Sequence, residues 1–399
     1  MKVGIKNSLP EPTNSAKANR LTVTLPSGVL SIQADATSIF SPDSLCGYAS
    51  RQNAKRAFLF VSRVLGKHIP ASAGIMRITH VGLANLLRPF LAKARKVVFL
   101  GFAETATGLG AGVFEAAWRR NLNLQDSMLF MQTTRYRLDK PVALDFQEEH
   151  SHATSHILYE PTEGALFHSA ESLVLVDDEL TTGQTNLNFL SAFLKVNPNV
   201  QRVALVSLVS WLTSDRRLAF TKAFPSIVFS FFSLASGTMT YTANPDFECP
   251  LMPAVRGNDQ LKDYLLDSSG SARFGWTKPM AIKAKKVLAL LSIDASRPVR
   301  VVGDGEFMHA AYLVAQALSD TGLAATAQTT TRSPILLGNA IESIVQFEDH
   351  YGDSMVNFLY NPPGYGDQVV FVHEAKGPLS LLAHLPGCTV QTLHIQDFL

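Results

Sequence analysis

The chain has 399 residues, of which 46% are hydrophobic, and its formal net charge is +2 at pH 7. This length predicts two or three domains with substantial cores, and the small charge gives no indication of a nucleic-acid or membrane surface. The three cysteines, Cys46, Cys249 and Cys388, have no paired spacing, which excludes a disulfide framework and favours a reducing compartment.

The N-terminal region combines a polar leader with two predicted elements. Residues 1–20 predict a flexible leader without the apolar core of a signal peptide, so we expect a cytoplasmic protein. Two alternating runs, 21–25 and 29–32, flank a Pro-Ser-Gly turn and predict a β-hairpin. The basic and apolar stretch 51–65 predicts a helix that ends at Gly66.

Short apolar runs then alternate with helical stretches, which predicts a parallel, doubly wound sheet. The runs are 97–100, 128–131, 173–176 and 203–208, and the helices include 83–94 and 113–121. A further run at 227–235 predicts a core strand, because it is too short to cross a bilayer. Ligands of such sheets bind at the carboxyl ends of the strands, so the residues after each run are the candidates for a site.

The third run is followed by an acidic pair and a turn rich in hydroxyl groups. Asp177 and Asp178 come first, and the chain continues as Glu179-Leu180-Thr181-Thr182-Gly183-Gln184-Thr185 into a predicted helix over 186–194. Backbone N–H groups at a helix start can bind a phosphate, and threonine hydroxyls add donors. The two carboxylates suit the hydroxyls of a sugar or a bound Mg²⁺. An ordinary strand, polar turn and helix is the alternative.

Two other strand ends carry candidate anion ligands. The loop 101–110 after the first run is rich in Gly, Ala and Thr, which lets backbone amides approach an anion, although tight turns share this composition. Arg135 and Arg137 follow the second run, and the guanidinium fork suits a diphosphate. A salt-bridging pair at the surface is the alternative interpretation of these two arginines.

The segment 146–156 contains two acids and three histidines between the second and third runs. His152 and His156 are four residues apart and could bind zinc from one helical face. No HExxH order is present, and a serine-rich loop is a poor rigid scaffold, so we favour a loop function for this segment.

A second α/β series follows a connecting segment. We predict a first domain over 21–245 that includes the N-terminal hairpin, a linker over 246–275 and a second, Rossmann-like domain over 276–399. The apolar runs of the second domain are 299–302, 324–328, 357–360 and 369–372, with a helix that ends at Leu318. The expected fold class is therefore α/β throughout, with a parallel sheet flanked by helices in each domain.

Two polar clusters follow strands of the second domain. Gly303, Asp304, Gly305 and Glu306 could cradle a phosphate or sugar, but a tight strand-to-helix turn explains them equally well, because the third glycine of the dinucleotide fingerprint is absent. In the second cluster, Thr331, Arg332 and Ser333, the arginine could clamp an anion. These three residues could also cap a helix that begins at Pro334.

The motifs resemble two known families. The residues Leu173 to Thr185 resemble the 5-phosphoribosyl-1-pyrophosphate (PRPP) signature of type I phosphoribosyltransferases. The tetrapeptide Thr331-Arg332-Ser333-Pro334, with 303–308 before it, resembles the TRSP domain. That domain lies C-terminal to an orotate-phosphoribosyltransferase-like domain in proteins associated with tellurite-resistance operons, and the blocks 56–70 and 148–153 are also similar to that family. The resemblance implies a type I phosphoribosyltransferase fold, Mg²⁺ as cofactor and, as is usual for type I enzymes, a homodimer.

The resemblance implies a role for each motif. Asp177 and Asp178 would contact the ribose hydroxyls and Mg²⁺. The 5′-phosphate would bind to the turn, with Glu179 and Gln184 in the same motif; its expected ligands are Thr181, Thr182, Gly183 and Thr185. The pyrophosphate would bind to the loop after the first strand, whose expected ligands are Ala103, Glu104, Thr105, Thr107 and Gly108.

The resemblance also places a mobile loop over 146–156, so that Glu148, Glu149, His150 and His152 would close over the substrate. Many relatives, such as orotate phosphoribosyltransferases, use a lysine in this loop, but no lysine lies between Pro141 and Ser172 here. Arg135, Arg137 and His150 are the candidate substitutes. Lys67 and His68 are further candidates near the base or the pyrophosphate, or they are simply cations at a helix end.

These expectations predict a transferase that moves ribose 5-phosphate from PRPP to a nitrogenous base and releases pyrophosphate, in the synthesis of a nucleotide or nucleoside-like metabolite. The second domain would modify the product or complete the acceptor site. A non-catalytic PRPP-binding regulator and an enzyme that cleaves a nucleotide N-glycosidic bond are the alternatives. A regulator of this fold usually adds a helix-turn-helix or a basic surface, and neither is evident in the sequence.

Overall fold

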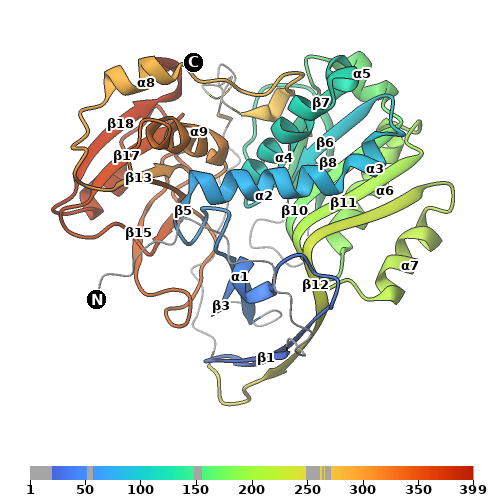
Figure 1. Cartoon of the computed structure of the whole chain (residues 1–399), viewed down its shortest axis with the longest axis horizontal. Helices are drawn as coiled ribbons and strands as arrows, with labels where there is room; N and C mark the ends of the chain where they lie inside the picture. The colour runs from blue at the N-terminus through green and yellow to red at the C-terminus, as the bar shows by residue number, and fades with distance from the viewer. Residues whose placement is uncertain are drawn as a thin grey trace.

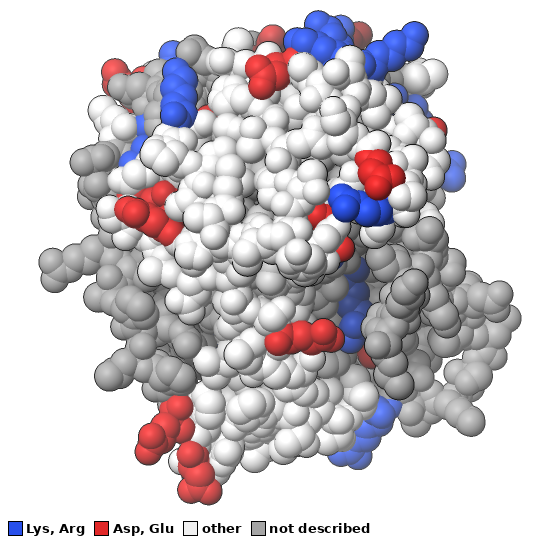
Figure 2. Space-filling model, turned by 90° about the vertical axis from the view of Figure 1, so that its left-hand side faces the viewer, with Lys and Arg blue, Asp and Glu red and all other residues white. Residues whose placement is uncertain are grey.

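The computed structural model describes residues 20–51, 57–147, 155–248, 261–262, 265 and 271–398. These residues form two α/β halves, each built around its own sheet, with helices packed between them (Figure 1). Among the described residues, every helix is too short or too polar to cross a bilayer. On the face shown in Figure 2, the described Lys and Arg side chains are scattered among Asp, Glu and a broad uncharged area.

The first half contains a seven-stranded sheet in the order β1-β2-β12-β11-β10-β6-β7. Strands β12, β11, β10, β6 and β7 are parallel neighbours, so the predicted parallel sheet is confirmed, and the predicted N-terminal hairpin adds β2 and β1 antiparallel at one edge. The strands are β1 Arg20–Leu25, β2 Gly28–Ala34, β6 Val97–Gly101, β7 Met128–Gln132, β10 Ser172–Leu180, β11 Arg202–Ser210 and β12 Val228–Ala243.

Helices cover both faces of this sheet, which is why β6 and β7 are buried along their whole length. Alternate residues of the strands enter two different cores: Val97, Phe99 and Val174 pack with α2 and α4, while Val98 and Leu173 pack with α5, α6 and α7. The helices of this half are α1 Pro42–Leu45, α2 Ala73–Leu86, α3 Arg88–Leu91, α4 Thr107–Arg120, α5 Gly164–Ser169, α6 Gln184–Val196 and α7 Ser214–Ala223, with the 3₁₀ helix η1 Leu122–Ser127.

The predicted helix over 51–65 is wrong in the part that the structure describes, which contains a strand. Strand β3 Cys46–Ser50 pairs antiparallel with β4 Phe58–Ser62 in a two-stranded sheet. Aromatic and β-branched residues favour strands, and the periodicity of so short an apolar run does not distinguish a strand from a buried helix. The ring of Phe60 stacks on that of Trp211 at a centroid distance of 4.9 Å, which fixes this hairpin over the end of β11. Another hairpin, β8 Val142–Gln147 with β9 Ser155–Tyr159, flanks the predicted mobile loop.

The second half contains a five-stranded sheet in the order β18-β17-β13-β14-β5. Its parallel strands are β13 Val299–Gly303, β14 Ala325–Thr329, β17 Gln368–His373 and β18 Thr389–His394. The predicted strand at 357–360 exists as β16 Val356–Tyr360, but it pairs with β15 Ile344–Glu348 outside this sheet. The helices of this half are α8 Ala284–Leu290 and α9 Met308–Ser319, with 3₁₀ helices η3 Ala272–Phe274, η4 Ser380–His384 and η5 Ile395–Asp397.

The two halves share structural elements. Strand β5 Ala71–Ser72 precedes α2 in the first half, yet it pairs antiparallel with β14 at the edge of the second sheet. Helix α2 then runs between the two halves (Figure 1), and α4 and α9 pack against each other beside it. The predicted domain boundaries stay a prediction, but a strand exchanged in this way holds the two halves together.

The contact between α4 and α9 leaves no space for a side chain at position 108. A Cβ atom on Gly108 would lie 2.7 Å from the Cβ atom of Met308. We expect Gly108→Ala to push the two helices apart and to lower the free energy of unfolding by about 1–3 kcal/mol. Gly74→Ala is the matched control, because a Cβ atom on Gly74 would have no other atom within 4 Å, and we expect it to be neutral or stabilising by roughly 0.5–1 kcal/mol. Urea unfolding measures both values, and equal effects would contradict tight packing at Gly108.

Candidate active site between the two halves

A cavity of about 190 Å³ lies at the carboxyl ends of β6, β7 and β10 and is closed by residues that follow β14. It brings together residues that the sequence predicted at four separate strand ends. The predicted residues that line it are Ala103, Glu104, Thr105, Arg135, Asp177, Asp178, Glu179, Thr181, Thr185, Thr331, Arg332 and Ser333. The cavity therefore belongs to both halves of the chain.

The acidic residues lie on the last part of β10, not in the turn that follows it. The strand continues to Leu180, and Asp177 pairs with Ser207 of β11. Asp177, Asp178 and Glu179 are each half-buried, and all three border the cavity. The Asp178 N–H donates to Oδ1 of Asp177 at 3.0 Å, which orients that carboxylate.

The turn after β10 contains a glycine that no other residue can replace without strain. Gly183 has a φ of 70° at the N-cap of α6, and a Cβ atom there would lie 2.7 Å from the ring of Phe220. Only part of the predicted phosphate-binding motif faces the cavity. Thr181 and Thr185 line it, whereas Thr182, Gly183 and Gln184 do not. Thr182 and Gln184 are exposed, and the Thr182 hydroxyl accepts the Gln184 N–H at 3.3 Å, which stabilises the turn.

The loop after β6 presents three of its five predicted ligands to the cavity. Ala103, Glu104 and Thr105 line the cavity, and the Ala103–Glu104 peptide bond is cis. The other two predicted ligands, Thr107 and Gly108, contact the second half instead of the cavity. Thr107 begins α4 and donates its hydroxyl to the carbonyl oxygen of Glu306 at 2.9 Å, and Gly108 packs against Met308 as described above.

Glu104 is buried and is held by a buried cation. Its Oε1 lies 2.5 Å from Nζ of Lys67. Burial by itself would raise the pKa of Glu104, but the charges of Lys67 and Arg135 lower it to about 2. Lys67 also donates to the carbonyl oxygens of Gly305 at 2.8 Å and Thr330 at 2.7 Å. Burial lowers the pKa of Lys67, and Glu104 opposes that effect.

Lys67 lies between the two halves and does not face the cavity. It is not at a helix end, and its ammonium group contacts three acceptors within the protein. It therefore holds Glu104 in place beneath the cavity and links the first half to the second.

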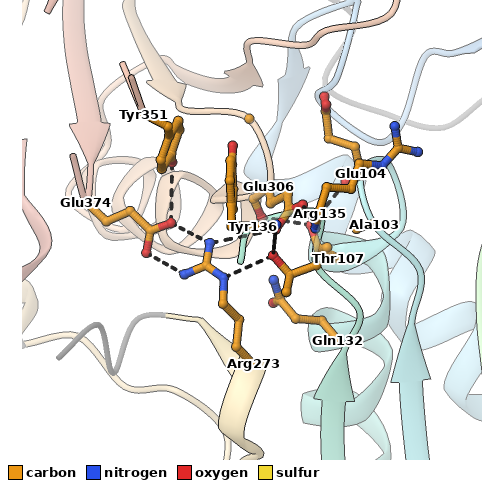
Figure 3. Close-up of polar contacts among 12 residues, drawn as sticks. Ala103, Glu104, Thr107, Gln132, Arg135, Tyr136, Arg273, Glu306, Tyr351 and Glu374 are labelled. Carbon is orange, nitrogen blue, oxygen red and sulfur yellow. Dashed lines mark hydrogen bonds and ion pairs between the residues drawn. The ribbon is translucent and has the colours of Figure 1, made fainter. Parts of the chain in front are cut away.

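The two arginines after β7 have different environments. Arg135 lines the cavity, and Figure 3 shows its guanidinium group beside Glu104. Its backbone N–H donates to Oε1 of Glu306 at 2.8 Å, so a residue of the second half fixes its position. Arg137 is exposed and outside the cavity lining, so the structure does not bring this predicted ligand to the site.

A buried network connects the halves behind Arg135, and Figure 3 shows its arginine, Arg273, between Glu306 and Glu374. Thr134 donates its hydroxyl to Oε2 of Glu306 at 2.6 Å, and Arg273 lies 3.7 Å from the same carboxylate. Arg273 also makes a two-pronged pair with Glu374, at 2.6 and 3.0 Å. Burial raises the pKa of Glu306, and Arg273 partly opposes the effect.

The first predicted cluster of the second half lies outside the cavity. Gly303, Asp304, Gly305 and Glu306 do not line the cavity. The Asp304 carboxylate is buried, accepts the Thr330 hydroxyl at 2.9 Å and lies 2.7 Å from Nδ1 of His350. These polar groups contact partners within the protein, which favours the alternative interpretation of 303–306 as a strand-to-helix turn.

The TRSP tetrapeptide, by contrast, borders the cavity through Thr331, Arg332 and Ser333. The predicted helix start at Pro334 is wrong, because Thr331 forms an isolated β-bridge with Phe358 and the residues after it are irregular. The Arg332 N–H contacts Oε2 of Glu104 at 3.4 Å, which joins this segment to the loop after β6.

The cavity also contains residues that were not predicted as PRPP ligands. The lining residues that were not candidates are Arg51, Leu59, Phe60, Phe102 and Met355, and His156 was a candidate only for zinc. His68, an open candidate near the base or the pyrophosphate, also lines the cavity, and burial lowers its pKa to about 3, so its imidazole is neutral. Arg51, Leu59 and Phe60 fell inside the wrongly predicted helix. A strand assignment at 58–62 would have placed this hairpin among the candidates.

The predicted loop residues Glu148, Glu149, His150 and His152 lie outside the described residues. His156, the other residue of the zinc alternative, is buried, contacts the Thr133 hydroxyl through Nδ1 at 3.1 Å and stacks on Phe146. No group of three or more His, Cys, Asp or Glu among the described residues could hold a metal ion alone. Mg²⁺ usually binds one or two carboxylates together with substrate phosphates, and the half-buried pair Asp177 and Asp178 fits that requirement.

Comparison with protein families gives matches to both halves. Residues 45–238 match the family model described as phosphoribosyl transferase, and residues 270–385 match the model of the TRSP domain C-terminal to it. The chain belongs to the phosphoribosyltransferases that carry a C-terminal TRSP domain. This membership makes it an enzyme of the PRPP-dependent pentosyltransferase class.

Several solved structures resemble the first half of this phosphoribosyltransferase. The adenine phosphoribosyltransferase of Rhodothermus marinus is 14% identical with a TM-score of 0.29, over 48% of this chain and 96% of that one. The Trypanosoma brucei enzyme is 12% identical with a TM-score of 0.33, over 48% and 78%. The Leishmania donovani enzyme is 18% identical with a TM-score of 0.29, over 48% and 76%. A comparison with curated proteins found no match.

Proposed function

We propose that this phosphoribosyltransferase transfers ribose 5-phosphate from PRPP to a nitrogenous base and releases pyrophosphate. One observation carries the proposal: a single cavity collects the acidic pair Asp177 and Asp178, the turn residues Thr181 and Thr185, and the loop 103–105. These are the groups that a ribose, a 5′-phosphate and a diphosphate would each require.

The reaction breaks the bond between ribose C1 and the diphosphate oxygen, and the electron pair leaves with pyrophosphate. A base nitrogen supplies the pair for the new bond to C1 and loses its proton. The ribose carries positive charge in the transition state, so catalysis requires positioning and charge stabilisation more than a nucleophilic side chain. Mg²⁺, when bound, would neutralise charge on the diphosphate.

The residues of this chain have distinct roles in that reaction. The carboxylates of Asp177 and Asp178 accept hydrogen bonds from the ribose hydroxyls and so orient C1. The Thr181 and Thr185 hydroxyls and the first N–H groups of α6 bind the 5′-phosphate. Leu59, Phe60 and Met355 bring apolar surface to the same cavity, which suits a flat base.

A product assay tests this proposal. The protein would be incubated with PRPP, MgCl₂ and a panel of purine and pyrimidine bases, and pyrophosphate would be detected by a coupled enzyme assay. We expect release of pyrophosphate that depends on one of the bases and on Mg²⁺. A different result would favour an enzyme that cleaves the N-glycosidic bond. In that case the protein would release ribose 5-phosphate and free base from a nucleotide, and it would neither release pyrophosphate from PRPP nor consume it.

The Mg²⁺ requirement, the homodimer, the cytoplasmic location and a link to tellurite resistance stay predictions from the resemblance. The first is tested in the assay above by omission of MgCl₂, and the second by light scattering.

A further inference from the structure

The TRSP segment and the PRPP motif border the same cavity, although Asp177 and Arg332 are far apart in the sequence. We propose that Arg332 of the second half binds the diphosphate of PRPP, so that the two halves form one active site. This inference rests on the proposed function and assigns the TRSP segment a task in the transfer reaction itself, not in a separate reaction.

Arg332 lines the cavity beside the loop that we assign to the diphosphate. Its backbone N–H contacts Glu104, a member of the loop assigned to the diphosphate. Its guanidinium carbon lies 5.0 Å from the ring centroid of Tyr136, the residue that follows Arg135. Two arginines of the cavity, one from each half, therefore flank the same loop residue, Glu104.

The guanidinium group is held rigidly and still has donors to offer. Nη2 donates to Asp349 at 3.2 Å and to Asp353 at 2.9 Å. Asp353 is in turn paired with Lys262 at 2.7 Å. The hydrogen bonds and ion pairs of the Arg332 side chain with these described residues all go through Nη2, and we assign Nε and Nη1 to the diphosphate. A guanidinium group held in this way can donate two parallel hydrogen bonds to two phosphate oxygens. Because the side chain is already fixed, it loses less conformational entropy when the ligand binds.

The local sequence shows that the cation at the diphosphate does not come from the predicted mobile loop. Charge builds up on the diphosphate as it leaves, and preorganised donors at that point lower the barrier. The segment 141–172 contains neither lysine nor arginine, so it cannot supply such a cation. Arg135 and Arg332 both line the cavity beside Glu104 and can do so.

Isothermal titration of three probes into wild-type protein and Arg332→Gln tests the inference. The probes are Mg²⁺-PRPP, Mg²⁺-pyrophosphate and ribose 5-phosphate. We expect Arg332→Gln to bind the first two about 10- to 100-fold more weakly, because a charged hydrogen-bond donor is lost, and to bind ribose 5-phosphate as wild type does. Arg300→Gln is the matched control, since Arg300 belongs to the same half but lies outside this cavity and bonds to Gln328 and Asn361. It should leave all three affinities unchanged.

The outcomes separate the inference from the proposed function. If wild type binds the probes and Arg332→Gln binds pyrophosphate equally well, the inference is wrong and the transferase proposal stands. If wild type binds neither PRPP nor ribose 5-phosphate, the proposed function fails and the inference with it. Arg332→Lys covers the case in which the glutamine variant does not fold. It keeps the charge but loses the fork, so we expect a loss of roughly 3- to 10-fold for pyrophosphate, and unchanged binding would again overturn the inference.

Discussion

Replacement of both Asp177 and Asp178 by asparagine is expected to weaken PRPP binding by roughly 10²- to 10⁴-fold. Each carboxylate would lose a charged hydrogen bond to a ribose hydroxyl or its share of Mg²⁺, and such a bond contributes about 1.5–3 kcal/mol. A factor of ten corresponds to about 1.4 kcal/mol. Isothermal titration of Mg²⁺-PRPP measures the change, and turnover should fall with it.

This effect should be separable from an effect on folding. Both side chains are half-buried at the edge of the cavity, so we expect the thermal unfolding of the double variant to resemble that of wild type. Asp139→Asn is a suitable control, because Asp139 is exposed and outside the cavity lining. Wild-type affinity for PRPP in the double variant would remove the acidic pair from the ribose site.

Replacement of Lys67 by methionine is expected to lower the free energy of unfolding by about 3–5 kcal/mol, because removal of one partner from a buried ion pair leaves an uncompensated charge. Glu104 would lose the cation 2.5 Å from its carboxylate, and two buried carbonyl oxygens would lose a donor. Lys96→Met is the control for loss of a lysine, since its partner Ser169 and their hydrogen bond are exposed. We expect the control to change stability by less than about 0.5 kcal/mol.

The pH dependence of stability gives a second readout of the same pair. In wild type the pKa of Glu104 is lowered from 4.5 to about 2. The resulting stabilisation is fully present above the ordinary pKa of the carboxyl group and is lost as the pH falls from about 4.5 to about 2. Without Lys67, burial would raise the pKa of Glu104, so the variant should lose stability as the pH rises above 4.5.

Denaturant unfolding at pH 4 and pH 7 would therefore show a smaller difference between wild type and Lys67→Met at the lower pH. The double variant Lys67→Met/Glu104→Gln should recover part of the loss at pH 7, because it removes the unpaired charge. Two results together would argue against an ionised pair. Lys67→Met would lose the same free energy of unfolding at pH 4 and pH 7, and the double variant would be no more stable than Lys67→Met at pH 7.

The PRPP motif could be predicted from the sequence because its structure is local. The strand, the turn with Gly183 and helix α6 follow one another in the chain, so the residue pattern reports directly on the fold. That β12, β11, β10, β6 and β7 form a parallel sheet was predicted from the alternation of apolar runs and helices, but their order in the sheet was not. The same reasoning placed Ala103, Glu104 and Arg135 at neighbouring strand ends, where the structure has them.

The composite cavity could not be predicted in this way, because it depends on contacts between distant segments. Glu104 contacts Arg332 across 228 positions, and Lys67 contacts Thr330 across 263. A Gly-Asp-Gly-Glu sequence after a strand is compatible with a ligand site or with a buried network. Only the packing of the two halves shows that Glu306 binds Thr134 and Arg135 of the other half.

A crystal structure of the full chain with Mg²⁺ and PRPP tests most directly the claim that both halves form one PRPP site. We predict that the ribose hydroxyls lie on Asp177 and Asp178, the 5′-phosphate lies on the turn 181–185, and the diphosphate lies between the loop 103–105 and Arg332. PRPP bound elsewhere in the protein, or bound in the cavity with its diphosphate directed away from the second half, would contradict the account.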